Sequence, residues 1–524
     1  MHADFSDTSF DDVPFDRADL EACLKVLGGI HTLGNDDARF IAVRRATSSM
    51  FKDVKKHRRR EAREAILAAD RETMERTATG AADRLDDETH GRELHSSLPD
   101  DVAERGASVG HYIQPRGCYI CKKDFVQVDA FHHALCPECA TSNRDRRKDH
   151  ADLRGKKAVL TGGRAKIGMH IALRLLRDGA HLTITTRFPK DAARRFASLE
   201  DSKDWLHRLR IVGIDLRDPG AVTSFAQRIA SEGALDILIN NAAQTVRRTA
   251  GSYSQLLAAE DVPLTPELEF SNGGPEIWGA EAPPQEHPRS LAAAFHLRSG
   301  HPAKGESGTV AASSYSLENP ENRASADRAQ QVANLAMTAG AASMERIAAG
   351  TAIDAGGLIP DIVTENSWTQ VLGEVDALEM LEVQLCNVTA PFLLNSILRP
   401  ALAASEARRK YIVNVSAMEG QFSRRYKGAG HPHTNMAKAA LNMMTRTAAE
   451  ELFETDRILM TAVDTGWITD ERPHDAKLRK ADEGWHAPLD LIDGAARVYH
   501  PIVDGERGID LYGCFIKDYV PSPW

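Results

Sequence analysis

Cysteine is scarce in this sequence, and long apolar runs and an excess of positive charge are lacking. Seven cysteines occur in 524 residues, four of them in two CxxC pairs, which in a reducing compartment indicates metal more readily than disulfides. The N-terminus has no charged-then-apolar leader, and no apolar run approaches membrane-spanning length. The formal net charge of -10 argues against non-specific nucleic-acid binding. We expect a soluble, cytoplasmic protein without membrane or nucleic-acid partners.

The length exceeds one ordinary domain, so two or more units are expected. Residues 1–110 form a polar helical region and a linker, and the linker composition covers residues 81–110. The basic run Lys55–Arg60 leads into an alanine-rich helical stretch. A solvated helix flank is favoured there over an arm that binds an acidic partner.

Residues 111–150 carry the two cysteine pairs, Cys118-Tyr-Ile-Cys121 and Cys136-Pro-Glu-Cys139. Each pair places two thiolates on one side of a tight turn, and four thiolates complete a closed tetrahedral zinc site. A closed site leaves no position open for catalysis, so we predict structural zinc in a small ribbon-like module. His132 and His133 are then interpreted as surface residues, and Arg144–Lys157 as a solvated linker.

Residues 151–524 begin with a short apolar run, a glycine-rich turn from Gly162 to Gly168, and an amphipathic pattern that ends before Gly179. This order predicts a strand, a turn and a helix. Glycines let the backbone approach a pyrophosphate, and the start of a helix binds its charge. The turn is therefore a candidate dinucleotide site.

Further apolar runs at His181–Arg187, Arg210–Leu216 and Leu235–Ala243 predict strands that alternate with helices. Such alternation predicts a Rossmann-like, doubly wound parallel sheet with ligands at its carboxyl edge. An acidic residue at the end of the second strand would suit a free ribose hydroxyl, but Arg187 stands there, with Lys190 close behind. This favours a 2′-phosphate and therefore NADP(H) over NAD(H).

Several short motifs follow one another in a family-specific order: Thr161-Gly162, Gly168, Asp215-Leu216, Asn240-Asn241-Ala242-Ala243, Asn387, Ile412–Ser416 and Lys438-Ala-Ala. From about Asp152 to Tyr519 the chain resembles the short-chain dehydrogenases/reductases, with one insertion at about 244–366. The resemblance implies hydride transfer to or from a carbonyl or alcohol substrate, and a homodimer or tetramer.

The resemblance also implies residue roles. Asp215 would face the adenine, Asn240 would support the central strand, Lys438 would hold the nicotinamide ribose, and Asn387 would hold a water of the proton relay. The candidate catalytic residues are Asn387, Ser416 and Lys438, which the resemblance implies, together with Thr434 at the usual tyrosine position and the neighbouring His433. The cofactor contacts are expected from Thr161, Gly162, Arg164, Lys166, Ile167, Gly168, Arg187, Asp215, Leu216, Asn241, Ala242, Lys438, Gly466 and Thr469.

The insertion is rich in small and polar residues, as in Gly305–Ser314. A lid, a partner-binding segment and plain disorder are all open for it, and Gln244–Arg248 at its base is the part most suited to ligand contact. After it we expect a helix from Trp368 to about Ala404 with a kink at Pro391. Strands are then expected at Tyr411–Val415 and Ile458–Val463, and a last strand at Asp510–Gly513.

The sequence departs from the family pattern at the catalytic positions. The family uses a tyrosine acid/base four residues before the lysine, which is one helical turn, but Thr434 occupies that position here. Threonine cannot serve as an acid/base near neutral pH, and as an N-cap it has a structural explanation. Ser416 is followed by Ala417, Lys166 replaces the middle glycine of the turn, and Thr465 replaces a proline.

Three hypotheses follow, in order of preference. The first is an oxidoreductase whose proton donor has moved to His433, His431 or Tyr426. The second is an inactive NADP(H)-binding sensor or scaffold that presents the zinc module, or the insertion, to a protein partner. The third is a fold that has lost dinucleotide binding, which leaves the retained Lys438, Asn387 and Gly168 without a role.

Overall fold

The structure is a computed structural model that describes residues 13–82, 84, 96–99, 102, 105–269, 273–279, 320–337, 343–424 and 426–524. Its contacts divide the chain into two compact units, Met1–Glu72 and Thr73–Trp524. The region of the cysteine pairs and the α/β region therefore lie in one unit. The boundaries expected near residues 110 and 150 stay predictions.

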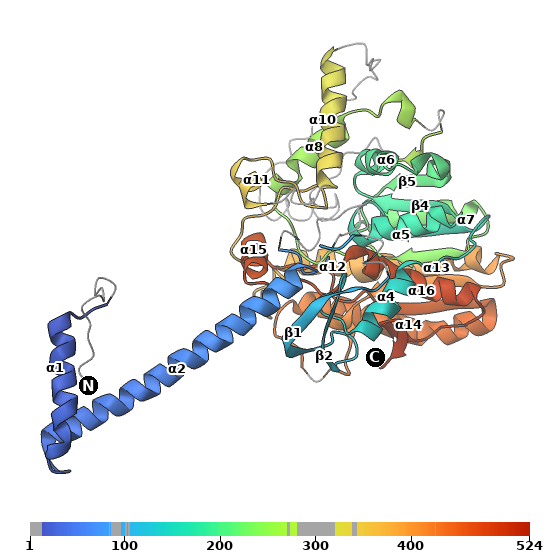
Figure 1. Cartoon of the computed structure of the whole chain (residues 1–524). Coiled ribbons are helices and arrows are strands. Elements are labelled where there is room, and N and C mark those ends of the chain that lie inside the picture. Colours follow the sequence, from blue (N-terminus) through green and yellow to red (C-terminus); the bar gives the residue numbers. More distant parts are fainter. Residues whose placement is uncertain are drawn as a thin grey trace. The chain divides into compact units, whose positions relative to one another are not determined.

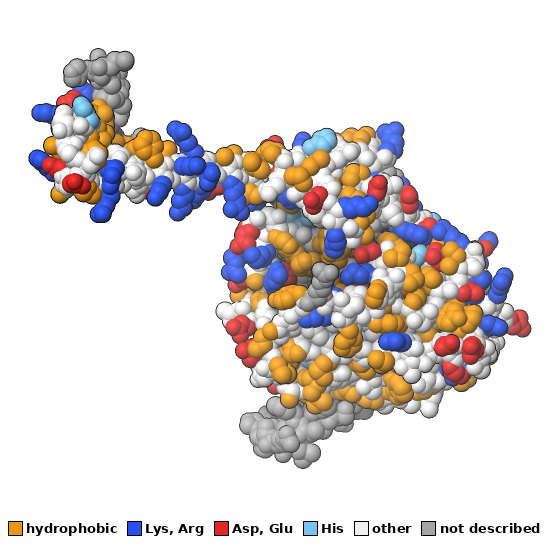
Figure 2. All heavy atoms as spheres, turned by 90° about the horizontal axis from the view of Figure 1, so that it is seen from below, with side chains coloured by type: hydrophobic (Ala, Val, Ile, Leu, Met, Phe, Trp, Pro, Cys, Tyr) orange, Lys and Arg blue, Asp and Glu red, His pale blue; other side chains and the backbone are white. Residues whose placement is uncertain are grey.

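The first unit is helical. α1 (Arg17–Gly29) begins after Asp16, and the side chains of Asp16 and Asp19 each accept a hydrogen bond from the other's backbone N–H, which is a capping box. α2 (Ala38–Glu75) follows a 3₁₀ turn at Ile30–Thr32. Lysine and arginine side chains are exposed along its middle turns (Figure 2), as expected for a solvated helix.

The second unit starts with a small cysteine-bearing module. Its hairpin consists of β1 (Ser108–Gly117) and β2 (Asp124–Asp129), which pair antiparallel. α4 (Pro137–Arg147) follows, with Cys136 at its N-cap. β1 begins at Ser108, so the module starts inside the segment that composition marks as linker.

A nine-stranded sheet forms the centre of the α/β part, in the order β11-β10-β9-β8-β6-β3-β4-β5-β7. All neighbours pair parallel except β10 and β11. The chain leaves β3 toward β4 and β5 and then returns to β6 on the other side of β3, so the strand order reverses there. The strands are β3 (Lys157–Thr161), β4 (His181–Thr186), β5 (Leu209–Gly213), β6 (Ile237–Asn240), β7 (Glu276–Trp278), β8 (Lys410–Ser416), β9 (Ile458–Asp464), β10 (Phe515–Lys517) and β11 (Val520–Ser522).

Helices cover both faces of this sheet (Figure 1). Successive strand residues point to opposite faces, so Leu160 packs with α5 and α16, whereas Val159 packs with α7 and α13. This is the predicted Rossmann-like, doubly wound α/β architecture. The helices are α5 (Lys166–Arg177), α6 (Pro189–Ala197), α7 (Pro219–Ser231), α8 (Ser254–Asp261), α10 (Pro320–Ala336), α11 (Met344–Ala348), α12 (Ala377–Gln384), α13 (Ala390–Ala403), α14 (Pro432–Asp456), α15 (His474–Asp482) and α16 (Leu491–Glu506).

In the part of the insertion that the structure describes, helices and a strand form, so plain disorder, one of the three alternatives, does not hold for those elements. β7 adds a parallel edge strand to β5, and α8 packs against α6 and α10. Regular structure forms because apolar side chains such as Leu256, Ala329 and Ala333 are buried. The example segment Gly305–Ser314 lies outside the described residues.

Two predicted elements need correction. The helix expected from Trp368 begins at Ala377, because the Asp376 carboxylate accepts from the N–H groups of Leu378 and Glu379 and caps the helix there. A π-helical turn at Leu385–Thr389 comes just before Pro391, as is common where a helix accommodates a proline or a functional site. The strand expected at Asp510–Gly513 is β10, which starts at Phe515 because Gly513 at φ 62° makes a turn before it, and a further strand, β11, follows it.

The continuous helical stretch Ala377–Ala403 also corrects the expectation that no apolar run approaches membrane-spanning length. It is long and apolar enough by composition to span a bilayer, and 39% of its most apolar window is buried within the protein. Leu394, Leu398 and Leu402 belong to the core between α13 and the sheet. Core packing thus accounts for the apolar residues on that side.

Candidate active site

A pocket of about 690 Å³ opens at the carboxyl edge of the sheet, where the strand order reverses. In open α/β sheets this crevice is where ligands bind. It is lined by loops that follow β3, β4, β5, β6, β8 and β9, and by Asp354, Gly356 and Leu358 of the insertion. The predicted site residues in the lining are Gly162, Arg164, Lys166, Ile167, Gly168, Arg187, Asp215, Leu216, Asn241, Ala242, Ser416, Lys438, Gly466 and Thr469.

The glycine-rich turn is built by close backbone packing between β3 and β6. Gly162 has φ 68°, and a Cβ there would lie 2.9 Å from the Ala242 Cα. A Cβ at Gly168 would lie 2.0 Å from the Gly162 carbonyl oxygen. The Thr161 hydroxyl accepts from the Asn241 and Ala242 N–H groups at 3.0 Å each. These contacts make both glycines necessary and explain why Thr161 sits behind the turn instead of lining the pocket.

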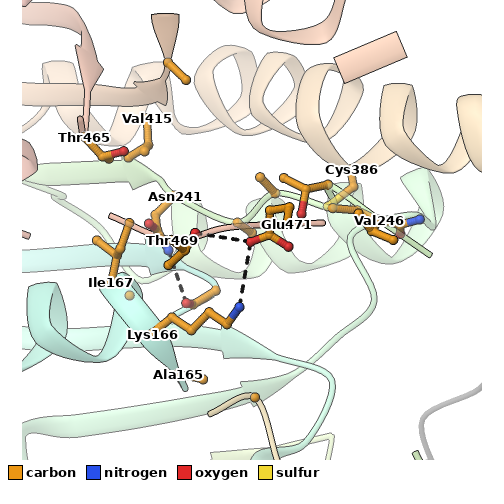
Figure 3. Close-up of a pocket in the computed structure, with 18 of the residues that line it drawn as sticks. Ala165, Lys166, Ile167, Asn241, Val246, Cys386, Val415, Thr465, Thr469 and Glu471 are labelled. Atoms are coloured by element: carbon orange, nitrogen blue, oxygen red, sulfur yellow. Dashed lines mark hydrogen bonds and ion pairs between the residues drawn. The ribbon is translucent and has the colours of Figure 1, made fainter. Parts of the chain in front are cut away.

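Lys166 is the departure from this pattern. It adopts φ 53°, a left-handed conformation that costs about 1–2 kcal/mol for a residue with a Cβ. Its ammonium lies 3.8 Å from the Glu471 carboxylate, which also accepts from the Thr469 hydroxyl at 3.3 Å (Figure 3). Lys166 thus links the turn to the loop after β9, at the residue where α5 begins.

The far end of the pocket lies beyond β4 and β5. Arg187 follows β4 directly, its guanidinium packs over the Phe188 and Tyr253 rings, and it donates to the Tyr253 hydroxyl at 3.2 Å. Burial alone would raise the pKa of Asp215, but hydrogen bonds from Arg217 hold that pKa below its usual value. Arg164 binds Asp191 at 2.6 Å, a carboxylate that it shares with Arg195 at 2.7 Å.

Lys438 lies at the other end, on α14. It is 6% exposed, and its ammonium donates to the Val415 carbonyl at 2.9 Å. Burial lowers the pKa of Lys438 to about 8, although Glu419, Cys386 and Asp464 favour the charged form. A cation held this way beside the end of β8 is suited to bind ribose hydroxyls.

Comparison with known proteins agrees with this geometry. Residues 156–260, which include the turn and the first four strands of the doubly wound sheet, match the sequence model described as short chain dehydrogenase. Over residues 156–260 the chain therefore resembles the short-chain dehydrogenases/reductases.

Individual relatives differ in how much of this chain their alignments cover. The chain is 27% identical over 407 residues to an uncharacterized protein, R665, of Acanthamoeba polyphaga mimivirus, and the match covers 74% of this chain and 71% of that protein. A 131-residue match to the peroxisomal 2,4-dienoyl-CoA reductase of Pongo abelii is 33% identical and covers 24% of this chain and 39% of the reductase. The NADPH-bound carbonyl reductase from chicken fatty liver aligns at 15% identity and TM-score 0.38, over 71% of this chain and 100% of that structure.

The chain departs from the expected short-chain dehydrogenase/reductase pattern around the start of α14. Thr434 is buried one turn before Lys438, outside the pocket lining, and its hydroxyl lies 3.4 Å from the His433 Nε2. The N-cap of α14 is His431, so the interpretation of Thr434 as an N-cap is wrong. Ser416 lines the pocket, but its hydroxyl donates to Asn442 at 2.6 Å.

Asn387, in the π-helical turn, is buried beside the base of the insertion. Its side-chain amide donates to the Gln244 carbonyl at 2.9 Å and accepts from the Gln244 N–H at 2.8 Å. It therefore fixes the backbone where the insertion leaves β6, and its expected water-holding role stays a prediction. Asn240 donates to Asn414 and Asn395 at 2.8 Å each, which ties β6 to β8 and α13.

The candidate proton donors differ in position. His433 is buried outside the pocket lining, and burial lowers its pKa. Tyr426 is 79% exposed. His431 lines the pocket, stacks on Trp368 with ring centroids 4.0 Å apart, and has its Nδ1 3.0 Å from the Trp368 carbonyl. Trp368 was not predicted as a site residue, because it is distant in sequence from the other site residues and follows the insertion without a motif.

The cysteine module brings its four thiols together. All four Sγ atoms lie within 4.8 Å of one another, and Cys121 Sγ is 3.7 Å from Cys136 Sγ. Tetrahedral zinc with Zn–S bonds of about 2.3 Å requires S–S distances of about 3.8 Å. The Lys123 backbone N–H lowers the pKa of Cys121 to about 7, whereas burial raises the pKa of Cys136 and Cys139, so the fit to zinc rests on the clustering of the four thiols. The donor set therefore fits zinc.

The module is not a surface appendage, and two sequence interpretations are wrong. His132 is fully buried and pairs with Asp493 at 2.9 Å, and His133 is buried beside the Thr79 hydroxyl. Arg147, expected in a solvated linker, binds Asp490 at 2.6 Å. His132 and Arg147 face the start of α16, and their partners lie more than 300 positions away in sequence, whereas the partner of His133 is 54 positions away.

Proposed function

We propose that this chain is an NADP(H)-binding oxidoreductase that transfers hydride to or from a carbonyl or alcohol substrate. The observation that carries the proposal is one pocket that holds both a glycine-bounded helix start and the buried Lys438. The helix start suits a pyrophosphate, and Lys438 suits the nicotinamide ribose. When bound, the cofactor supplies the hydride chemistry. The chain's own residues must then bind it, orient the substrate and supply a proton.

His431 is the proton donor that the geometry favours. A carbonyl oxygen only accepts, so the contact with Trp368 assigns a ring proton to Nδ1 and leaves Nε2 as the nitrogen that would face a substrate. The residue also has φ 43°, a strained conformation of the kind that gathers at functional sites. The stacked Trp368 ring holds the imidazole in one orientation.

Preference for NADP(H) rests on Arg187. It follows β4, where the ribose of the adenosine would lie, and its guanidinium is oriented by two aromatic rings. Replacing it with alanine should weaken NADPH binding by about 10- to 100-fold, because a hydrogen bond to a charged group contributes about 1.5–3 kcal/mol, and should leave NADH binding unchanged. Calorimetric titration of both variants with both cofactors measures this difference.

The test of catalysis compares two neighbouring histidines. With a set of aldehydes and ketones, NADPH absorbance should fall in a substrate-dependent way. His431→Gln should lower kcat by about 100-fold or more, the usual contribution of an acid/base, with an unchanged Kd for NADPH. His433→Gln is the matched control and should keep most of the activity. Full activity in His431→Gln would place the donor elsewhere.

A second candidate is an inactive NADP(H)-binding scaffold. It is favoured by the buried Thr434 at the usual tyrosine position and by the contact between Lys166 and Glu471, which joins the two sides of the phosphate end. It predicts tight NADPH binding, no turnover of any carbonyl, and a protein partner whose affinity changes with the cofactor. Pull-down of partners with and without NADPH separates it from the enzyme.

We also propose that the cysteine module holds structural zinc and that the chain forms a homodimer or tetramer. Support for zinc comes from the four clustered thiols. Support for self-association comes from α14 and from α12 and α13, the two helices that pack against it. These helices carry four exposed apolar side chains: Leu381, Phe392, Met436 and Met443. Light scattering of the purified chain, and of Phe392→Glu, measures the oligomeric state.

A further inference from the structure

The cysteine module and the cofactor pocket share one hydrophobic core. Cys118, Leu135 and Cys136 of the module pack in the same cluster as Ile468 and Leu491, and Ile167 packs against it. Ile167, Ile468 and Leu491 also line the pocket. The module therefore packs behind Ile167, Ile468 and Leu491, and so supports the glycine-rich turn and the loop after β9.

Polar contacts also connect the module to residues 487–493, which include Leu491. Arg84, which precedes β1, donates to the carbonyls of Ala487 and Leu489 at 2.7 and 2.6 Å. Arg147 binds Asp490 and His132 binds Asp493, at 2.6 and 2.9 Å. These contacts surround Leu491 on both sides in sequence. The start of α16 is thus held by the polar side chains of Arg84, His132 and Arg147, of which Arg84 and His132 are buried.

Tyr119 makes the most direct connection. It lies between Cys118 and Cys121, and its own N–H donates to the Ala134 carbonyl at 2.8 Å. Its hydroxyl oxygen accepts from the Trp467 N–H at 2.9 Å. Trp467 follows Gly466 in the loop after β9, and both line the pocket. A residue inside a cysteine knuckle therefore sets the backbone of the loop that borders the cofactor.

The position of Tyr119 depends on the geometry of the knuckle. Lys122 closes that knuckle at φ 62°, a left-handed conformation that is unfavourable without compensation. Metal bonds to four thiolates supply such compensation in small modules, many of which unfold without metal. Removing the metal should release Tyr119, and with it the Trp467 backbone.

We propose that Tyr119 is a positioning residue for the cofactor, and that metal in the four-cysteine site and NADPH in the pocket strengthen each other's binding. The inference rests on the proposed function, because NADPH is the ligand in question. Linkage between two sites is reciprocal. If metal raises NADPH affinity by a given factor, NADPH must raise metal affinity by the same factor.

The experiment uses the full chain and compares Tyr119→Phe with Tyr112→Phe. The Tyr112 hydroxyl donates to the His133 carbonyl at 2.9 Å inside the module, so this control loses a similar hydrogen bond away from the loop. Tyr119→Phe should retain zinc and weaken NADPH binding by about 3- to 10-fold, and Tyr112→Phe should bind NADPH as the wild type does. A chelator competition should require about tenfold more chelator to remove zinc when NADPH is saturating.

Hydrogen exchange of the amides in residues 465–472 gives a readout that needs no cofactor. Exchange should accelerate in Tyr119→Phe and after zinc removal, but not in Tyr112→Phe. Wild-type NADPH affinity and exchange in Tyr119→Phe would overturn the inference, as would zinc loss that leaves the loop unchanged. A wild-type chain that binds no NADPH would refute the proposed function and the linkage to cofactor, while the exchange result would still decide whether Tyr119 positions the loop.

Discussion

Replacement of Lys438 by methionine should make the folded protein more stable near neutral pH while removing its function. The side chain is 6% exposed, and burial lowers its pKa from 10.5 to about 8. Near neutral pH the folded state therefore carries a desolvated charge. At about 1.4 kcal/mol per pKa unit, this penalty amounts to about 3 kcal/mol. Loss of the hydrogen bond to Val415 offsets about 1 kcal/mol of it, so the variant should gain about 2 kcal/mol.

The pH dependence gives the sharper test. Between the folded pKa of about 8 and the unfolded value of 10.5, the unfolded state binds more protons than the folded state, so wild-type stability rises with pH across this window. The penalty is complete below the folded pKa and is lost above the unfolded one. From about pH 7 to about pH 10, the advantage of Lys438→Met over the wild type should therefore shrink by about 2.5 kcal/mol.

Urea unfolding followed by tryptophan fluorescence measures this stability difference in the second structural unit, Thr73–Trp524. All six tryptophans lie in that unit, between Trp205 and Trp524. Titrations common to both proteins cancel when the two are compared. Lys203→Met, at an exposed site, controls for the loss of a lysine as such. A stability difference that is the same at both pH values would refute the reasoning, because it would mean that Lys438 is not held as a desolvated amine.

Two further substitutions test the turn and the metal site. Gly168→Ala should weaken NADPH binding by about tenfold or more, because its Cβ would lie 2.0 Å from the Gly162 oxygen, whereas Gly28→Ala has nothing within 4 Å and should bind normally in the same titration. Cys118→Ser should lose zinc by metal analysis and lower the unfolding midpoint, with exposed Cys23→Ser as the control; a wild-type chain that contains no zinc would contradict the assignment.

The sequence alone determined the features that depend on local pattern. The order of strand, glycine turn and helix from Ala158 to Gly179 needs only neighbouring residues, and so does the spacing of the two cysteine pairs. Apolar runs of strand length also predicted β3 to β6, β8 and β9. Such signals are readable because the residues that produce them are close together in the chain.

Tertiary structure alone decided which distant residues meet. His132 and His133 follow the hairpin like surface residues, and only the packing of α16 against the module buries the first beside Asp493. His431 and His433 are two positions apart on one segment, yet only the fold turns His431 toward the pocket. Tyr119 and Trp467 lie 348 residues apart. No periodicity in the chain encodes these contacts, because they depend on how separately formed elements pack together.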